Sequence, residues 1–466
     1  MTVGTPWKQI LVFTMPMLLG NIAQQLYSTV DSVVVGRYVG DNALAAVGSA
    51  APIINLLLVL FIGVSMGATI MVSQFLGARD RDSLSWTIGN CVLLILITAV
   101  IMTVAGVIIA RPMLELLRTP ESILDWSASY LRIIFLGSIG MGFFNILSGV
   151  LRGLGDSVSA LIYLVVASVL NIVLDIFFVA NLDMGVSGVA LATIIAQGIS
   201  ALLCINRLRK MRDVFDFGLR YCRWQRRFAG RIIRLGLPSG VTQAIFSMSI
   251  VLVQSITNSF GEQVIAANVI LQRVDGFAML PNFSFGTAMT TYAGQNVGAG
   301  DQRRVEQGSR QGLLLAVIAS SLITAVILLF GRNLMAIFTT TEELVALSYH
   351  FMTILAFGYI VMAVIQTLLG VMRGAGDTMT PMWLSIVQTF ALRLPLAYIM
   401  VWLSRSEENP IGRPEMIFWS LLIAWIIGGI ATVVFYRLGR WKNKGLVQAK
   451  TAAEEQVQEE TENAAL

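Results

Sequence analysis

The chain has 466 residues, of which 56% are hydrophobic and 13% are charged, and its mean hydropathy is +0.76. Soluble globular proteins carry roughly 25% charged residues, so this composition excludes a soluble globular protein. The net charge of +5 agrees with contact to anionic lipid rather than with nucleic-acid binding.

Apolar runs of about 20 residues recur along the chain, and each can cross a hydrocarbon core of roughly 30 Å. They predict an all-α polytopic membrane protein with twelve transmembrane helices, six in each half. The spans expected in the first half are 9–35, 48–73, 86–110, 127–149, 158–180 and 185–206. Those expected in the second half are 231–257, 268–293, 312–330, 347–370, 379–402 and 416–436.

These spans divide the chain into two lobes with a polar segment between them. We expect an N-terminal six-helix lobe over 1–206 and a C-terminal six-helix lobe over 231–440. The strongly basic segment 207–230 is predicted to be a cytoplasmic linker. Residues 441–466 are expected to form a cytoplasmic tail, which is acidic and disordered at its end, where the last 19 residues hold five Glu.

The distribution of Lys and Arg predicts the orientation in the cell membrane. About 23 basic residues lie on the side of the N-terminus and about 7 on the other side, which places both termini in the cytoplasm. Six spans in each half give the halves the same orientation. We therefore expect a pseudo-twofold axis along the membrane normal, with a cavity between the two bundles.

One eight-residue stretch occurs twice. Residues 149–156 read Gly-Val-Leu-Arg-Gly-Leu-Gly-Asp and residues 370–377 read Gly-Val-Met-Arg-Gly-Ala-Gly-Asp, at an offset of 221 residues that also relates other parts of the halves. A fixed offset of this kind indicates a tandem duplication. Each copy is expected to be a turn between the fourth and fifth spans of its half, in which glycine permits positive φ and aspartate caps the next helix. The turn is interpreted as a structural hinge or as a gating contact.

Acidic side chains inside the first-half spans are candidate functional residues, because an ionisable group in a span costs roughly 2.5–3.5 kcal/mol on insertion scales. Asp31 lies in the first span, on the same helical face as Gln24 and Tyr27. Asp175 lies in the fifth span, four residues after Asn171. The two aspartates fall at a similar depth in the outer half of the bilayer.

Thr193 in the sixth span reaches a comparable level. Oxygen atoms from three helices at one depth could bind Na⁺, with Asp31 and Asp175 as metal ligands. Two desolvated carboxyl groups near each other could instead carry a proton. A third interpretation is that each aspartate caps a helix end or faces headgroup water.

The second half does not repeat these acids. Leu252 and Leu396 occupy the positions equivalent to Asp31 and Asp175. This half instead has Asp275 in its second span and Arg393 in its fifth. The two side chains could form an ion pair, or Arg393 could face the central cavity and contact substrate, so the cation chemistry is assigned to the first half.

Pro16 in the first span and Pro238 in the seventh lie at equivalent places. Each proline removes one backbone hydrogen bond from its helix. The first helix could therefore bend at Pro16 when Asp31 changes charge or ligand, or the proline could be a static kink.

The remaining reactive residues give no sign of catalysis. The three cysteines are scattered without metal-ligand or disulfide spacing, and the single His350 has no neighbouring ligand set. Phosphate-loop and catalytic Ser/His patterns are also missing from the sequence. We expect neither an enzyme nor a bound cofactor.

Taken together, these features resemble the multidrug and toxic compound extrusion (MATE) family, over the chain to about residue 440. The resemblance rests on Val30-Asp31-Ser-Val-Val-Val-Gly36, Gln74-Phe-Leu-Gly77, the doubled Arg-Gly-x-Gly-Asp turn and Asn171-x-x-x-Asp175. It implies two six-helix bundles around a V-shaped cavity that opens to alternate sides of the membrane. It also implies export of substrate driven by inward H⁺ or Na⁺.

Within that family the chain looks like the DNA-damage-inducible F subgroup, whose N-terminal lobe carries the functional aspartates. Carried over by motif, the polar cluster of that lobe corresponds to Asp31, Asn145, Asn171, Asp175 and Thr193. Gln24 matches a cavity-lining position, and Pro16 matches the proline at which the first helix bends. The other major bacterial subgroup has acids in its seventh and tenth helices, whereas the tenth helix here offers only Gln366.

We therefore expect an antiporter that exports amphipathic, often cationic small molecules in exchange for H⁺ or Na⁺. Its cavity is expected to include Gln24, Tyr27, Gln366, Arg393 and Asp275. The expected partners are these substrates and membrane lipids, without nucleic acid, and the chain is expected to act as a monomer. The alternative is a flippase for lipid-linked saccharides or lipids from a related exporter family.

Overall fold

The computed structural model describes residues 1–218, 220–407 and 409–446. The regular elements in these ranges are helices, and no strand is found among them. The predicted acidic, disordered stretch at the end of the tail lies outside the described residues. At the start of the tail, a short 3₁₀ helix, η4 (Arg440–Asn443), is formed.

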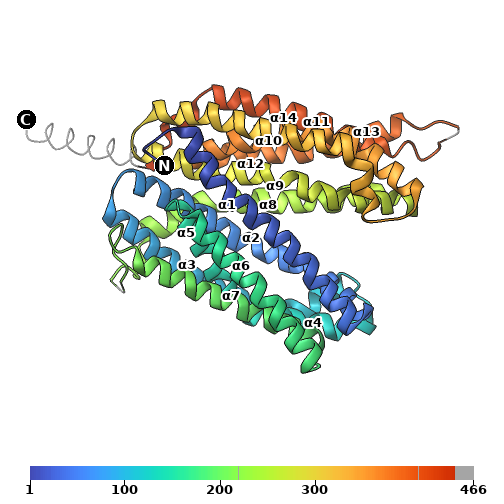
Figure 1. Ribbon diagram of the computed structural model, residues 1–466, viewed down its shortest axis with the longest axis horizontal. Coiled ribbons are helices and arrows are strands. Elements are labelled where there is room, and N and C mark those ends of the chain that lie inside the picture. The colour runs from blue at the N-terminus through green and yellow to red at the C-terminus, as the bar shows by residue number, and fades with distance from the viewer. Residues whose placement is uncertain (219, 408, 447–466) are drawn as a thin grey trace, which may run out of the picture. The chain divides into compact units, whose positions relative to one another are not determined.

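Figure 1 shows the helices in chain order. The first half contains α1 (Pro6–Val34), α2 (Asp41–Gly77), α3 (Arg81–Leu116), α4 (Glu121–Leu136), α5 (Ser138–Gly153), α6 (Ser157–Ile176) and α7 (Gly185–Lys210). The second half contains α8 (Arg226–Asn258), α9 (Glu262–Gly298), α10 (Gln302–Ala336), α11 (Glu342–Gly374), α12 (Met379–Ile386), α13 (Leu394–Leu403) and α14 (Glu415–Arg437). Three π-helical segments interrupt or extend them, namely η1 (Val35–Val39), η2 (Phe177–Asn181) and η3 (Val387–Arg393).

The twelve predicted spans are confirmed. Among the described residues, eleven helical stretches are long and apolar enough to cross a membrane, and α4 and α5, which meet at a bend of 55°, make a twelfth when they are counted together as one span. The helices extend beyond the predicted apolar ranges, because their polar first and last turns continue the same helix. The bend was not predicted, and it lies at Gly137, where a Cβ atom would overlap the side chain of Ile194.

The chain forms two compact units, whose boundaries differ from the predicted lobes. One unit contains Met1–Thr14 with Val241–Leu466, and the other contains Met15–Gly240. We call the first the C-terminal unit and the second the N-terminal unit. The predicted limits of 1–206 and 231–440 miss this exchange, because α1 and α8 each contribute their first turns to one unit and their remainder to the other.

Packing explains why the first turns are exchanged. The side chain of Ile10 on α1 is fully buried in the core of the C-terminal unit, and the backbone N–H of Trp7 donates to Gln311 Oε1 at 2.8 Å. In the N-terminal unit, the first turns of α8 approach α2 so closely that a Cβ atom on Gly236 would overlap the carbonyl of Gly63.

The inner helices of each unit pack through small residues. In the C-terminal unit, α9, α10, α11 and α14 lie side by side (Figure 1), and a Cβ atom on Gly370 would overlap the carbonyl oxygen of Gly286. In the N-terminal unit a Cβ atom on the equivalent Gly149 would overlap the hydroxyl of Ser65. Membrane helices gain much of their association from such close backbone contacts.

The doubled glycine turn has the predicted local structure. Gly155 and Gly376 have φ of 89° and 97°. Asp156 Oδ1 accepts a hydrogen bond from the backbone N–H of Ser159 at 3.0 Å, and Asp377 Oδ1 accepts one from that of Thr380 at 3.2 Å. The predicted positive φ and helix capping are therefore confirmed.

Each aspartate of the turn also forms an ion pair that the sequence did not indicate. Asp156 pairs with Arg207 at 2.7 Å in the N-terminal unit, and Asp377 pairs with Lys444 at 2.9 Å in the C-terminal unit. Each basic partner comes from the last turn of a spanning helix or from the segment after it. Each ion pair thus links the turn between the fourth and fifth spans of a half to the end of its sixth span or to the segment after it.

Candidate cation site in the N-terminal unit

The two intramembrane aspartates of the first half lie together. Asp31 comes from α1 and Asp175 from α6, and their carboxyl groups lie close enough to influence each other. The Asp175 side chain is fully buried and that of Asp31 is partly buried. Two neighbouring carboxyl groups can share one proton, and this arrangement fits such a pair.

Two further predicted residues join the pair. Asn171 lies one helical turn before Asp175 and is 1% exposed. In the amide orientation that satisfies all its partners, Asn171 donates to Asp175 Oδ2 at 2.8 Å. Its oxygen accepts from the backbone N–H of Thr193 at 3.1 Å and lies 3.2 Å from the Thr193 hydroxyl. The amide therefore links α6 to α7 and orients the Asp175 carboxyl.

Two tyrosines complete the surroundings of the pair. Tyr27, one turn before Asp31 on α1, lies close to Thr193. Tyr130 on α4 is 6% exposed and lies within electrostatic range of Asp31 and Asp175. Sequence reasoning missed Tyr130, because a single tyrosine in an apolar helix is an ordinary packing residue and only its hydroxyl needs a polar neighbour.

Both aspartates precede a π-helical segment. Asp31 lies four residues before η1, and Asp175 lies two residues before η2. The two segments contact each other. A π-helical turn is wider than an α-helical turn and is frequent at functional sites. Neither segment contains a residue pattern from which it could have been predicted.

Two carboxyl oxygens in the site have no partner. Asp31 Oδ1 and Asp175 Oδ1 are buried and accept no hydrogen bond in the part of the chain that the structure describes. A buried oxygen without a partner is costly, so each atom is available to a proton or a cation. No group of three or more His, Cys, Asp or Glu is found among the described residues. Na⁺ would therefore need additional oxygen atoms from Asn171, Thr193 or the backbone.

Other predicted site residues of this unit lie outside the hydrogen-bonded cluster. The Asn145 amide donates to the carbonyl oxygen of Met141 in its own helix at 2.8 Å, and no hydrogen bond joins it to either aspartate within the described ranges. Gln24 is exposed on α1. Pro16 lies inside α1, fifteen residues before Asp31 and two residues after the unit boundary.

The charged residues of the second half occupy the C-terminal unit. Asp275 on α9 accepts a hydrogen bond from the Tyr359 hydroxyl at 2.9 Å, and Arg393 Nη1 donates to Ser249 Oγ at 2.6 Å. A direct ion pair between Asp275 and Arg393, one of the two sequence-based alternatives, is not formed within 4.0 Å in the described structure. Arg393 ends the π-helical segment η3.

Comparison with known proteins gives concordant matches over nearly the whole chain. The model of the MatE family matches residues 16–177 and 238–399, so each matched part begins at one of the two equivalent prolines. The probable multidrug resistance protein YpnP of Bacillus subtilis (strain 168) is 30% identical over 450 residues, covering 96% of this chain and 99% of the relative.

A second relative agrees with the subgroup indicated by the sequence. The DNA damage-inducible protein F of Escherichia coli (strain K12) is 26% identical over 340 residues, covering 72% of this chain and 74% of the relative. Among solved structures, an outward-facing multidrug resistance MATE family transporter of the MOP superfamily superposes with a TM-score of 0.87. It is 25% identical, and the match covers 93% of this chain and 96% of that one.

Proposed function

The chain belongs to the MATE family of multidrug efflux transporters, and we propose that it exports amphipathic, often cationic compounds in exchange for H⁺ bound at Asp31 and Asp175. It is a polytopic membrane transporter and not an enzyme. The proposed exchange is secondary antiport by alternating access. The observation that carries the proposal is the close approach of two acidic side chains from different helices, each with a buried carboxyl oxygen that accepts no hydrogen bond among the described residues.

Electrostatics explains why such a pair responds to protons. Two ionised carboxylates about 4 Å apart repel each other by about 4 kcal/mol at an effective dielectric constant near 20. The pair is therefore stable with one shared proton or with two protons, and unstable with none. Each unit charge that crosses 100 mV supplies about 2.3 kcal/mol, so one or two protons can drive a useful concentration gradient.

Neutralisation of the pair is the proposed trigger. With one shared proton, the negative charge on Asp175 strengthens its hydrogen bond from Asn171. A second proton removes that charge and weakens the hydrogen bond from Asn171 to Asp175. Because Asn171 also bonds to Thr193, this loosens the link between the pair and α7. We propose that α1 then bends at Pro16 and that the outward-open cavity releases its substrate.

Na⁺ is the second candidate ion, and the oxygen atoms around the pair support it. The Asn171 carbonyl and the Thr193 hydroxyl lie beside Asp175, and carboxylate, amide and hydroxyl oxygens are suitable ligands for a hard cation. In this alternative both carboxylates stay ionised, and the cation replaces the shared proton.

The substrate cavity and the topology are proposals of the same kind. Gln24 and Tyr27 of the N-terminal unit, with Asp275, Gln366 and Arg393 of the C-terminal unit, are proposed to contact substrate. Asn145 is proposed to join the cation site in another conformation. Both termini are proposed to lie in the cytoplasm, and the chain is proposed to act as a monomer. Export of small molecules is favoured over the flippase alternative, because YpnP and the superposed transporter are multidrug proteins by name.

Ethidium efflux from membrane vesicles tests the function and the ion together. A pH gradient at constant Na⁺ should drive efflux, and a Na⁺ gradient at constant pH should not. Asp31→Asn and Asp175→Asn should each insert normally and lose gradient-driven efflux, because neither variant can form the shared-proton pair.

Asp183→Asn is the matched control, since Asp183 is an exposed acid eight residues after Asp175, in the short connection between η2 and α7. It should retain native efflux. Full efflux by Asp31→Asn would overturn the proposed site, and efflux driven by Na⁺ alone would replace H⁺ with Na⁺.

A further inference from the structure

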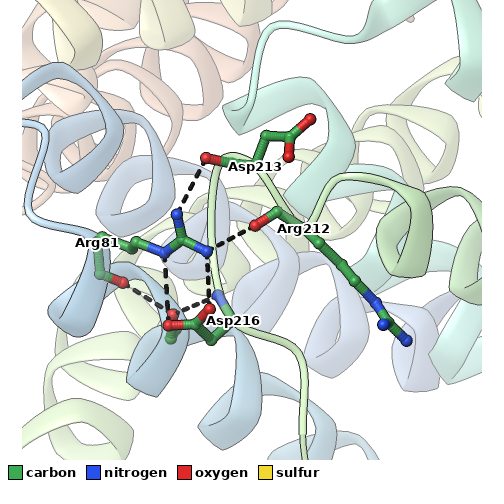
Figure 2. A network of polar contacts seen from close by, with 5 residues as sticks. Arg81, Arg212, Asp213 and Asp216 are labelled. Atoms are coloured by element: carbon green, nitrogen blue, oxygen red, sulfur yellow. Dashed lines mark hydrogen bonds and ion pairs between the residues drawn. The ribbon is translucent and has the colours of Figure 1, made fainter.

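The basic segment between the two halves is folded onto the start of α3 (Figure 2). Arg81 Nη2 donates to the carbonyl oxygen of Arg212 at 2.6 Å and to Asp216 Oδ1 at 2.7 Å, and its Nη1 donates to the carbonyl oxygen of Asp213 at 3.2 Å. The backbone N–H of Asp216 donates in turn to Ser85 Oγ at 2.9 Å. One arginine on α3 thus binds three residues of the linker, Arg212, Asp213 and Asp216.

The rest of the segment is held by the same helix. Phe215 is fully buried, and a Cβ atom on Gly89 would overlap the carbonyl oxygen of Tyr221. The backbone N–H of Gln225 donates to Asn90 Oδ1 at 3.0 Å. The predicted linker is therefore an ordered strap on the N-terminal unit along its described residues. Groups that are already ordered lose little entropy when they bind a partner.

The exposed surface of the strap is cationic. Arg223, Arg226 and Arg227 are exposed, and none of them forms an ion pair within 4.0 Å among the described residues. The two acids of the segment do not neutralise them, because Asp216 is paired with Arg81 and Asp213 lies ten residues before Arg223. Trp224, between these arginines, is 53% exposed. An exposed tryptophan beside cations is typical of the membrane–water interface.

The cationic surface continues into an apolar stripe on α8. Arg226, Ile233 and Leu237 follow one another at helical spacing, and the last two are 41% and 57% exposed. At 1.5 Å rise per residue, Leu237 lies about 16 Å along the helix from Arg226. The stripe therefore runs from the charged end of a spanning helix into its apolar part, over a length comparable to a lipid headgroup with much of an acyl chain.

We propose that this surface is a binding site for an anionic phospholipid. Arg223, Arg226 and Arg227 bind the phosphate and the anionic headgroup, Trp224 lies at the ester level, and the acyl chains lie along Ile233 and Leu237. The three unpaired cations favour a lipid with net negative charge over a zwitterionic one. The apolar stripe favours a lipid over a soluble anion. The site rests on the proposed membrane position of α8 and is independent of the exported substrate and of the coupling ion.

Native mass spectrometry of the purified transporter with defined phosphatidylglycerol and phosphatidylcholine tests the site. The native chain should bind phosphatidylglycerol more tightly than phosphatidylcholine. In Arg223→Gln/Arg226→Gln/Arg227→Gln the affinity for phosphatidylglycerol should fall about a hundredfold, because each basic residue near an anionic surface contributes roughly fivefold. The matched control Arg303→Gln/Arg437→Gln/Arg440→Gln removes three exposed arginines from the other unit and should leave the affinity unchanged.

Two further measurements separate the parts of the site. Ile233→Asn/Leu237→Asn should weaken binding of phosphatidylglycerol, while soluble glycerol phosphate should compete poorly with the lipid. Arg81→Gln should reduce the preference for phosphatidylglycerol, because it releases the strap while Arg223, Arg226 and Arg227 stay in the chain.

Equal affinity of the native chain for the two lipids would overturn the proposal. An unchanged affinity in the first triple variant, or an equal loss in the control triple, would also overturn it. Efficient competition by glycerol phosphate would show a site for a soluble anion instead. These outcomes are measured without a drug or a gradient, so they are distinct from a failure of the proposed antiport.

Discussion

Two acidic side chains lie against each other in an apolar helix bundle at Asp31 and Asp175. Like charges this close repel each other strongly, and a bound proton or cation would relieve that repulsion. Burial is equally important, because exposed carboxylates would be screened by water. The C-terminal unit places Leu252 and Leu396 at the equivalent positions, which explains why we assign the cation chemistry to one unit.

The turn aspartate of the N-terminal unit, Asp156, has a structural role that depends on pH. Burial raises the pKa of Asp156, but hydrogen bonds from Ser159 and the ion pair with Arg207 outweigh it and hold the pKa below its ordinary value. A lowered folded-state pKa means that the stabilisation is present above the unfolded-state pKa and is lost as the pH falls through the folded-state value.

We therefore expect Asp156→Asn to melt at a lower temperature than the native chain at neutral pH and to approach it at low pH. The difference at neutral pH should correspond to about 1 kcal/mol or less, because Asn still caps the helix and only a partly exposed ion pair is lost. Thermal unfolding in detergent from pH 7 down to about pH 4 and below checks this. Asp82→Asn, an exposed acid at the start of α3, should shift little, and an equal shift would contradict the role of the ion pair.

Residue types and spacing predicted much of the site. The shared depth of Asp31 and Asp175, with Asn171 and Thr193 beside Asp175, was sufficient to group these four side chains. The contribution of Tyr130 could not be predicted, because it depends on how α4 packs in the helix bundle. Asn145 had the residue type expected for the cluster, but its amide hydrogen-bonds within its own helix.

Among the helices, repeated glycine contacts hold each unit together. A Cβ atom on Gly370 would overlap the carbonyl oxygen of Gly286 on the neighbouring helix α9. Gly370→Ala should force α11 and α9 apart and lower the melting temperature by several degrees, equivalent to about 1–3 kcal/mol, as other overpacked sites do.

The matched control is Gly48→Ala on α2, where a Cβ atom would meet nothing within 4 Å. This change should be neutral or slightly stabilising, because alanine loses less conformational entropy in a helix than glycine. Equal melting temperatures of the two variants, measured by thermal unfolding, would show that the glycine contact is unimportant.

The order and number of the helices could be predicted from hydropathy, whereas their irregularities could not. The 55° bend between α4 and α5 depends on the approach of Ile194 to Gly137, and that approach is a tertiary contact. The π-helical segments after Asp31 and Asp175 likewise have no local sequence signal. The π-helical segments closely follow the two aspartates of the proposed site, and departures from regular geometry are expected at functional sites.

For the whole molecule, the exchange of helix beginnings between the units is the main departure from the predicted domains. The duplication at an offset of 221 residues indicated two equal halves, but the contacts of Ile10 and Gly236 assign the first turns of α1 and α8 to the opposite unit. Hydropathy shows where a helix begins and carries no information about which bundle its first turns pack against. Pro16 and Pro238 lie within a few residues of these boundaries.

A bend in α1 at Pro16 would let its two parts change direction independently. Pro16→Ala restores the missing hydrogen bond and should stiffen α1, so the rate of drug efflux should fall about tenfold, equivalent to about 1.4 kcal/mol of barrier. Efflux from vesicles under a fixed pH gradient measures this. Pro112→Ala, at an exposed proline inside α3, is the control and should keep the native rate. An unchanged rate in Pro16→Ala would make that proline a static kink.

The central claim is that the pair of Asp31 and Asp175 binds the protons that drive export. Substrate added to the detergent-solubilised transporter in weakly buffered solution with a pH indicator tests it most directly, because an antiporter that binds one partner must release the other. We expect proton release from the native chain and from Asp183→Asn, and none from Asp31→Asn or Asp175→Asn. Equal proton release from the native chain and from both site variants would contradict the claim.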